Sequence, residues 1–175
     1  MNISVFLGSA DGRCQVYNDE AYKIGELIAS KQHTLVYGGA LCGNMGATYR
    51  GCKENGGKVI GIMPQFFVER GIGAVDSDEF IITKDMDERK NLLINKCDAA
   101  IVLPGGVGTL EEMADIISLN KLKRIDKKVI IYNPNGFYDS IRILFIKMID
   151  EGFLTEENLK NVTFVDTIEE IAELI

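Results

Sequence analysis

Short runs of apolar and β-branched residues recur along the chain at regular intervals. Most of these runs are too short and too uniformly apolar to have one face in water, which indicates strands buried on both faces of a sheet. We expect seven such strands, at residues 3–7, 34–37, 59–63, 80–83, 99–103, 129–132 and 162–165.

Between these runs lie segments of helical length whose apolar residues are three or four positions apart. One has apolar residues at positions 21, 24, 27 and 28, and another at positions 113, 116 and 117. Strands that alternate with helices from end to end form a parallel sheet with helices on both faces. The 175 residues contain no repeat, low-complexity tract or linker. We therefore predict a single doubly wound α/β domain over residues 1–175.

Ligands of doubly wound folds bind in the crevice beyond the carboxyl ends of the strands, so the loops after the strands are the candidate sites. Three of these loops, at residues 8–12, 38–46 and 104–109, are rich in glycine. Glycine makes up 18 of the 175 residues, which is about 10% against a usual ~7%. Because glycine lets backbone N–H groups approach a phosphate at a helix N-terminus, the loops predict a cradle for an anion or nucleotide.

Two common phosphate motifs do not fit these loops. The dinucleotide fingerprint G-x-G-x-x-G needs a third glycine after Gly106 and Gly108, where the chain has Glu111. A Walker A loop needs a lysine after its glycine spacing, but residues 38–43 are followed by Asn44. Dinucleotide binding and nucleoside triphosphate hydrolysis are therefore disfavoured, and a smaller phosphorylated ligand remains.

The segment after the fifth predicted strand has two open interpretations. Thr109 and Glu112 have the spacing of a capping box, in which two side chains bond backbone amides at a helix start. A cap needs at most one glycine, whereas Gly105, Gly106 and Gly108 all precede it. The second interpretation is that these glycines present amides to a phosphate and that Thr109 adds a hydroxyl.

Another helix is predicted to open with charged residues of both signs. Asp85 and Glu88 fit a capping box, whereas Arg89 and Lys90 lie near the positive end of the helix dipole, where cations are disfavoured. Either the acids, Asp87 included, offset the two cations, or the cations face a phosphorylated ligand, Arg89 through its bidentate fork.

Net charge and histidine content narrow the chemistry. The 26 acidic and 19 basic side chains give −7, which disfavours nucleic acid polymers and anionic membranes as partners. His33, before a strand, is the only histidine, so a zinc site of several histidines is excluded. Because the sequence shows no ligand cluster, we expect no metal and no organic cofactor. Catalysis must then use carboxylates, Arg, Lys, hydroxyls or backbone amides.

The remaining patterns predict ordinary structural roles. Four cysteines far apart, without a C-x-x-C motif, are typical of buried thiols in a reduced, cytosolic protein, although Cys42 lies in a glycine-rich loop near the expected ligand. We expect no signal peptide and no transmembrane span. The basic residues between positions 121 and 128 predict a solvated face at a helix C-terminus. An apolar stripe at positions 141, 144, 145 and 148 predicts a helix packed on the core or on a partner.

Together these motifs resemble the LONELY GUY family of cytokinin riboside 5′-monophosphate phosphoribohydrolases, long mislabelled as lysine decarboxylases. Residues 104–112 read Pro-Gly-Gly-x-Gly-Thr-x-x-Glu, and residues 86–90 read Met-x-x-Arg-Lys. The loops at residues 8–12 and 37–46 also match, so the resemblance extends over nearly the whole chain.

The resemblance implies a Rossmann-like fold, a homodimer, and hydrolysis of the N-glycosidic bond of a nucleoside 5′-monophosphate without a cofactor. It implies that Arg89 and Glu112 are catalytic, because a carboxylate near the ribose can stabilise an oxocarbenium-like state or activate water. It implies that the glycines and the threonine of residues 105–109 hold the 5′-phosphate. The residues implied to contact the nucleotide are Gly8, Ser9, Gly38, Gly39, Gly43, Met45, Lys90, Gly105, Gly106, Val107, Gly108, Thr109, Glu111 and Ser118.

Five positions depart from the family's usual pattern. Asp87 replaces a His, Ala40 a Gly and Asn44 a Leu, and Gly71 and Ala74 stand where many members have Glu and His. These departures keep open a non-hydrolytic nucleotide- or molybdenum-cofactor-binding protein of the same superfamily. Amino-acid decarboxylation is disfavoured, because no segment resembles the setting of a pyridoxal-phosphate lysine.

Overall fold

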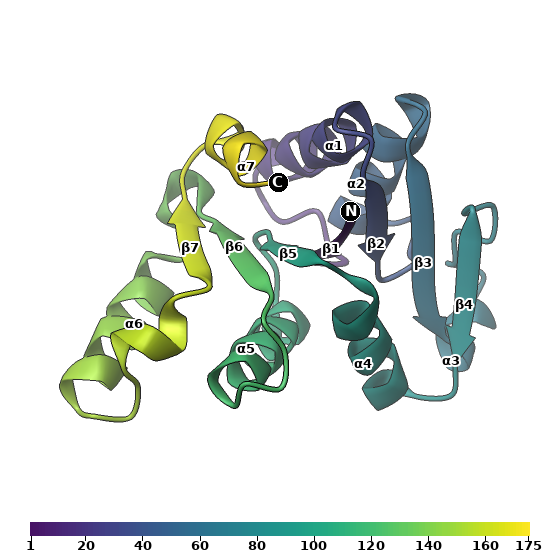
Figure 1. The fold of residues 1–175 in the computed structure, drawn as a ribbon. Helices are drawn as coiled ribbons and strands as arrows, with labels where there is room; N and C mark the ends of the chain where they lie inside the picture. The colour runs from purple at the N-terminus through teal and green to yellow at the C-terminus, as the bar shows by residue number, and fades with distance from the viewer.

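The computed structural model describes residues 1–175, and it has strands and helices in alternation from end to end (Figure 1). The strands are β1 (Asn2–Phe6), β2 (Thr34–Tyr37), β3 (Lys58–Pro64), β4 (Glu79–Thr83), β5 (Ala99–Val102), β6 (Lys128–Tyr132) and β7 (Val162–Val165). The α-helices are α1 (Gln15–Ser30), α2 (Gly43–Glu54), α3 (Gln65–Val68), α4 (Met86–Lys96), α5 (Val107–Lys121), α6 (Asp139–Asp150) and α7 (Ile168–Leu174). Two 3-10 helices, η1 (Pro134–Gly136) and η2 (Glu156–Leu159), lie in connections.

All seven strands form one parallel sheet in the order β4-β3-β2-β1-β5-β6-β7, which confirms the predicted doubly wound α/β fold. The chain runs outward from β1 to β4 and then returns to β5 on the other side of β1. The connections therefore diverge at the carboxyl ends of β1 and β5. At such a point the loops leave a crevice, which is where ligands of this fold bind.

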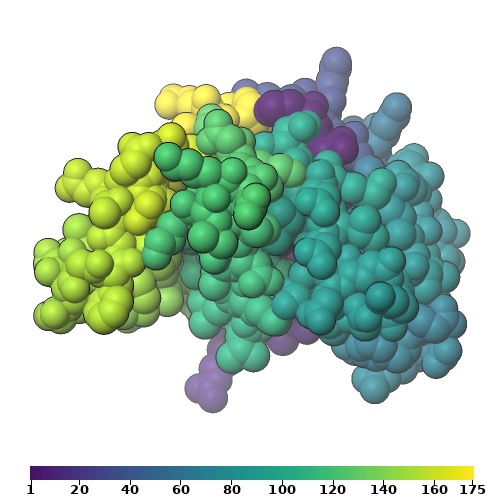
Figure 2. Space-filling view, turned by 60° about the horizontal axis from the view of Figure 1, so that its bottom comes forward, coloured from purple at the N-terminus to yellow at the C-terminus, as the bar shows by residue number.

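The sheet separates two hydrophobic layers, because successive side chains of each strand point to opposite faces. On β1, Val5 belongs to the layer that includes residues of α1, α2 and α7, whereas Phe6 belongs to the layer that includes residues of α4 and α5. Figure 1 shows α1, α2 and α7 on one side of the sheet and α4, α5 and α6 on the other, and Figure 2 shows the latter side facing the viewer. The core is therefore built from both faces of the central strands.

The expectation of strands buried on both faces is confirmed for the centre of the sheet and is wrong at its edges. Every residue of β5 is buried, whereas β4 and β7 have mostly half-exposed or exposed side chains, because each has a neighbour on one side only. The strands β1 and β5 end one residue earlier than predicted, and Leu7 and Leu103 enter the loops as buried residues.

Two structural predictions about polar residues need correction. The expectation of buried thiols holds for Cys52 and Cys97, whereas Cys14 and Cys42 are exposed, because they precede the first turns of α1 and α2. The basic segment is not wholly solvated either. Lys127 donates hydrogen bonds to backbone carbonyls at the end of α4, where a cation satisfies both the orphan acceptors and the helix dipole.

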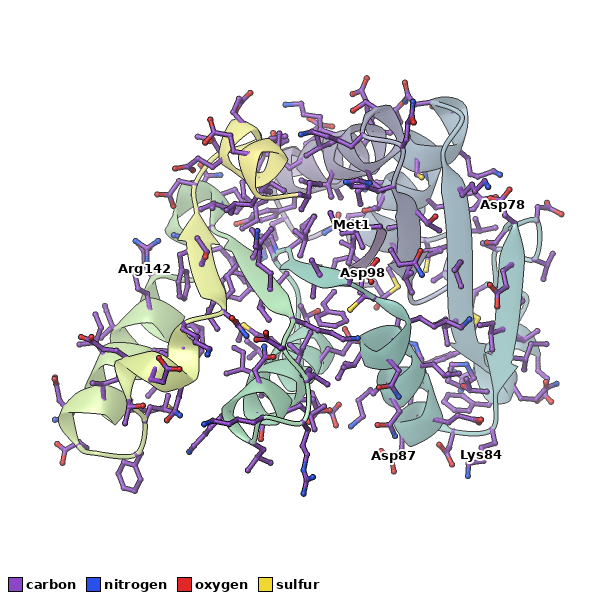
Figure 3. All side chains as sticks on the ribbon, in the orientation of Figure 1. Met1, Asp78, Lys84, Asp87, Asp98 and Arg142 are labelled. Carbon is purple, nitrogen blue, oxygen red and sulfur yellow. The ribbon has the colours of Figure 1, made fainter.

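The predicted apolar stripe of α6 divides between core and solvent. Ile141 and Phe145 pack against the core, whereas Leu144 is 45% exposed, and no residue of α6 is fully buried. Arg142 lies over the ring of Phe164 on β7, with its guanidinium carbon 4.8 Å from the ring centroid (Figure 3). None of the helices combines the length and the apolar character needed to cross a bilayer.

Candidate active site

A cavity of about 440 Å³ lies at the carboxyl edge of the sheet, where the loops after β1, β2, β3 and β5 meet the first turns of α4 and α5. It has three parts: a glycine-rich wall, a buried ion pair and an apolar end. The lining residues are Leu7, Gly8, Ser9, Gly38, Ala40, Cys42, Met45, Met63, Phe67, Ile72, Met86, Arg89, Gly106, Val107, Gly108, Thr109 and Glu112.

The glycine-rich wall is the N-terminus of α5. Its N-cap residue is Gly106, in an extended conformation and with no side-chain cap, so the amides of the first turn lack acceptors within the helix. A Cβ added at Gly106 or Gly108 would meet open space, which shows that the cavity approaches the backbone here without hindrance. Thr109, buried in the same turn, adds a hydroxyl. Free amides at the positive end of a helix dipole favour an anion.

Of the two interpretations of this segment, the capping box of Thr109 and Glu112 is therefore wrong. The helix begins at Val107, so Thr109 is its third residue and Glu112 its sixth. Since Gly106 takes the N-cap position without a side-chain oxygen, the first-turn amides stay free for a ligand. The interpretation that the glycines present amides to an anion fits this geometry.

Glu112 forms a buried ion pair with Arg89 of α4. The Arg89 Nη1 donates to the Glu112 Oε1 at 2.7 Å, and the Arg89 Nε donates to the backbone carbonyl of Ile62 at 3.2 Å. The side chains of Arg89 and Glu112 are only 8% and 7% exposed. The second carboxylate oxygen of Glu112 and the Arg89 Nη2 have no partner among the protein's hydrogen bonds. Because both residues line the cavity, these two atoms are available to a bound molecule.

The first turn of α4 explains how Arg89 reaches the interior. Asp85 caps the helix by accepting from the Glu88 amide at 2.9 Å, as the predicted capping box requires. The Glu88 carboxylate accepts from the Lys84 amide at 2.8 Å, whereas a capping box would have it accept from the amide of Asp85, the next residue. Arg89 thus pairs with Glu112 instead of these acids, and Asp87 points outward from α4, away from the cavity (Figure 3).

Burial determines the electrostatics of the pair. Loss of water around the carboxylate raises the pKa of Glu112, and the Arg89 guanidinium, which lowers it, offsets only part of that effect. A carboxylate with a raised pKa is a stronger base than an ordinary glutamate. With one oxygen held by Arg89 and the other free, Glu112 can accept a proton or face a developing positive charge in the cavity.

The apolar end of the cavity was only partly foreseen. Met45 was expected in the site and lines it, and Cys42 also lies near the expected ligand, as its loop suggested. Phe67 and Ile72, in and after the short helix α3, were missed. The segment between β3 and β4 has no hydrophobic period from which their direction could be deduced. Together with Met63 and Met86 these residues form a surface suited to a flat apolar group, not to one with many hydrogen bonds.

The structure does not bring every predicted residue to the cavity. Lys90 lies outside the cavity, with its side chain 15% exposed and its ammonium 2.7 Å from Glu111 and 3.3 Å from Asp115, and these acids raise its pKa. Ser118 is exposed about three turns along α5 from its start.

Three predicted glycines serve the packing of the loops. Gly39, with φ +78°, packs against β3, and Gly43, with φ +56°, lies against the backbone of Ser9. A Cβ at Gly105 would lie 2.1 Å from the Thr109 hydroxyl, so glycine lets the loop rest on that side chain.

The other departures and the histidine lie in different surroundings. Ala40 lines the cavity, Ala74 is buried in the core, and Gly71 has φ +71° in the loop before β4. His33, before β2, has its Nδ1 at 3.3 Å from the amino group of Met1, away from the cavity, as expected for a non-catalytic residue.

Comparison with known sequences gives consistent matches. The model of a family described as possible lysine decarboxylase matches residues 45–175. A cytokinin riboside 5′-monophosphate phosphoribohydrolase of Mycobacterium marinum is 33% identical over 84% of this chain and 79% of its own length. A protein of the same name from Arabidopsis thaliana is 36% identical over 87% of this chain and 67% of its own length.

Solved structures with the same fold are more distant in sequence. A molybdenum cofactor binding protein from Rippkaea orientalis is 22% identical, with a TM-score of 0.72 over 99% of this chain and 93% of that one. A molybdenum cofactor carrier protein from Chlamydomonas reinhardtii is 20% identical, with a TM-score of 0.75 over 99% of this chain and 94% of that one. At this identity the likeness establishes the Rossmann-like fold alone.

Proposed function

Because the chain belongs to the LONELY GUY family, we propose that it is a nucleoside 5′-monophosphate phosphoribohydrolase. The reaction is hydrolysis of the N-glycosidic bond of AMP, or of an AMP carrying a substituent on N6, to a free base and ribose 5-phosphate. The relatives' names specify cytokinin riboside 5′-monophosphate as the substrate of those proteins.

The position of Glu112 relative to the N-terminus of α5 is the observation that carries this proposal. Glu112 lies three residues after Thr109, about one helical turn or ~5 Å along the axis, and both line the same cavity. A phosphate on the first-turn amides would therefore leave its ribose beside the free carboxylate oxygen. The base would then extend toward Met63, Phe67 and Ile72.

The chemistry follows from that arrangement. As the C1′–N bond breaks, its electron pair leaves with the base, which takes up a proton, and positive charge develops on the ribose. Glu112 is placed to stabilise this charge and to accept a proton from the water whose oxygen bonds to C1′. Arg89 holds Glu112 in position through Nη1 and offers Nη2 to the sugar or phosphate. Phosphate binding would fix the ribose, so that binding energy from a part of the substrate remote from the broken bond orients C1′ relative to Glu112.

Further features of the proposal come from the family and the composition. Gly8, Ser9 and residues 105–109 would surround the phosphate. Three residues that do not line the cavity, Lys90, Glu111 and Ser118, would take part only beyond a single chain. We accordingly propose a homodimer, and a monomeric mass by light scattering at micromolar concentration would contradict it. Four free cysteines suit a reducing, cytosolic setting.

Base release is the experiment that tests the proposed function. The protein is incubated with AMP, N6-substituted AMP, IMP, GMP, CMP or UMP, without added metal or cofactor, and the products are separated by chromatography. We expect free base and ribose 5-phosphate from at least one adenine nucleotide, and loss of both in Arg89→Ala. Asp115→Asn, which changes a carboxylate outside the cavity about one turn beyond Glu112 on α5, should retain activity. Full activity of Arg89→Ala would contradict its assigned role.

The alternative is a binding protein without turnover. The similarity in fold to molybdenum cofactor binding and carrier proteins, together with the departures at Asp87, Ala40 and Asn44, keeps it under consideration. Saturable binding of a nucleotide, with no base released from any monophosphate, would favour this alternative over the hydrolase.

A further inference from the structure

The loop that carries the proposed phosphate site has few side chains that could hold it. Between the end of β5 and the start of α5 the chain reads Leu-Pro-Gly-Gly, and three hydrogen bonds hold Leu103 and Pro104. The Leu103 amide donates to the Phe6 carbonyl at 2.9 Å, and the Gly8 amide donates to the Pro104 carbonyl at 3.4 Å. The third bond is the shortest, because the Tyr138 hydroxyl donates to the Leu103 carbonyl at 2.7 Å.

The Leu103 carbonyl depends on this hydroxyl. The paired register of β5 and β6 ends at Val102 and Ile131, one residue before Leu103, and the carbonyl has no other partner in the protein. Leu103 is only 2% exposed, so water does not replace a lost donor there. A buried acceptor without a partner costs free energy, and a loop of glycines can shift to relieve that cost.

The position of Tyr138 is fixed independently of the loop. Its ring is buried in the hydrophobic layer under α4 and α5, and burial raises the pKa of Tyr138, so the hydroxyl keeps its proton. Asn133, directly after β6, accepts from the Tyr138 amide at 2.5 Å. The Asn133 side chain also donates to Asp139 at 2.9 Å and to Asp166, directly after β7, at 3.3 Å. The ends of two strands therefore determine where the hydroxyl lies.

We propose that Tyr138 is a positioning residue for the proposed phosphate site. By holding the Leu103 carbonyl, its hydroxyl sets the direction in which the chain leaves β5 and, three residues later, the place of Gly106 at the N-cap of α5. Neither Gly105 nor Gly106 has a side chain that could correct a change in that direction. Tyr138 does not line the cavity, so it acts on a ligand only through this loop. The proposal rests on the proposed function in one respect, the binding of the 5′-phosphate at the start of α5.

The test compares the binding of AMP with that of adenosine, which lacks the phosphate, by isothermal titration calorimetry. All proteins carry Glu112→Gln, so that AMP binds without being consumed. Tyr138→Phe removes the hydroxyl and keeps the ring in the core. We expect it to weaken the binding of AMP about three- to tenfold, which is the effect of losing one hydrogen bond, and that of adenosine less than about twofold.

Tyr132→Phe is the matched control. Tyr132 is 3% exposed at the end of β6, in the other hydrophobic layer, and its hydroxyl donates to Glu20 instead of to the loop. This variant should leave both affinities within about twofold of the parent protein. A purely structural role of the Tyr138 hydroxyl would weaken AMP and adenosine alike, because it has no connection with the phosphate.

Three results would overturn the positioning role: unchanged binding of AMP in Tyr138→Phe, equal weakening of AMP and adenosine, or a parent protein that binds AMP no better than adenosine. Base release from AMP is measured separately, with Glu112 intact. If no base is released while Tyr138→Phe weakens AMP selectively, the proposed hydrolase fails and the role of Tyr138 stands. If AMP is hydrolysed while Tyr138→Phe leaves AMP binding unchanged, the role of Tyr138 alone fails.

Discussion

Gly38, the residue directly after β2, controls the position of Arg89. A Cβ built at Gly38 would lie 2.1 Å from the Arg89 Nη2 and 3.1 Å from the Met45 side chain. The backbone of Gly38 lies outside the left-handed region, so alanine can adopt its conformation. The Gly38→Ala substitution therefore acts through contact with the guanidinium and not through backbone strain.

The size of the effect follows from how Arg89 is held. To reach ordinary contact at 3.4 Å, the guanidinium nitrogen must retreat by about 1.3 Å. The bonds from Nη1 to Glu112 and from Nε to Ile62, at 2.7 and 3.2 Å, cannot both survive such a shift. A hydrogen bond to a charged group contributes about 1.5–3 kcal/mol, so we expect kcat for base release to fall about 10- to 100-fold.

Activity and stability measurements together test this reasoning. The kcat of Gly38→Ala is measured with AMP, and its free energy of unfolding is measured in urea in the wild-type and in the Arg89→Ala backgrounds. We expect Gly38→Ala to destabilise the wild-type background by about 1–3 kcal/mol and the Arg89→Ala background only slightly, because the guanidinium that the new methyl group would contact is absent there. Wild-type activity in Gly38→Ala, or equal destabilisation in both backgrounds, would show that Gly38 does not position Arg89.

Four further predictions follow from the site and the core. Because burial raises the pKa of Glu112, the acid limb of the kcat/KM profile should lie above about pH 4.3, the ordinary glutamate value, and an acid limb at or below that value would contradict this. The pKa of Glu112 is higher in the folded than in the unfolded protein, so its contribution to the free energy of unfolding falls as the pH rises above the ordinary glutamate value. In urea titrations at different pH, Glu112→Gln should lack this dependence. Iodoacetamide should inactivate the protein by alkylating Cys42, and bound AMP should protect it, because Cys42 lines the cavity. The Cys42→Ser variant, which still has the exposed Cys14, should resist inactivation. Equal inactivation of the wild-type protein and of Cys42→Ser would contradict this. Tyr138→Phe should lower the free energy of unfolding by about 1 kcal/mol, since its hydroxyl donates to the Leu103 carbonyl at 2.7 Å in the core, and an unchanged value would show that this bond contributes nothing.

The fold could be predicted from the sequence because a parallel sheet requires apolar runs, and each predicted run falls on an observed strand. The edge position of β4 was not predictable in the same way. Its composition resembles that of the central strands, and only pairing in space leaves one side of it open.

The site could be predicted only as far as local chemistry determines it. The resemblance to the family suggested Arg89 and Glu112 as catalytic candidates, but their pairing depends on the meeting of α4 and α5 beside the sheet. Capping rules suggested Thr109 as the N-cap because they favour a residue with a side-chain oxygen at the helix start. In the structure the N-cap is Gly106, which has no side chain to make that hydrogen bond. The apolar residues Phe67 and Ile72 come from an irregular segment, whose direction only the folded backbone fixes.

The central claim is that Glu112 performs the hydrolysis of a nucleoside 5′-monophosphate held at the start of α5. The most direct measurement is the amount of adenine and ribose 5-phosphate formed from AMP by the wild-type protein and by Glu112→Gln, with AMP binding measured by calorimetry on both. We predict equal amounts of the two products from the wild-type protein, and none from Glu112→Gln while AMP still binds. Products formed by Glu112→Gln at the wild-type rate, or no products from the wild-type protein, would contradict the account.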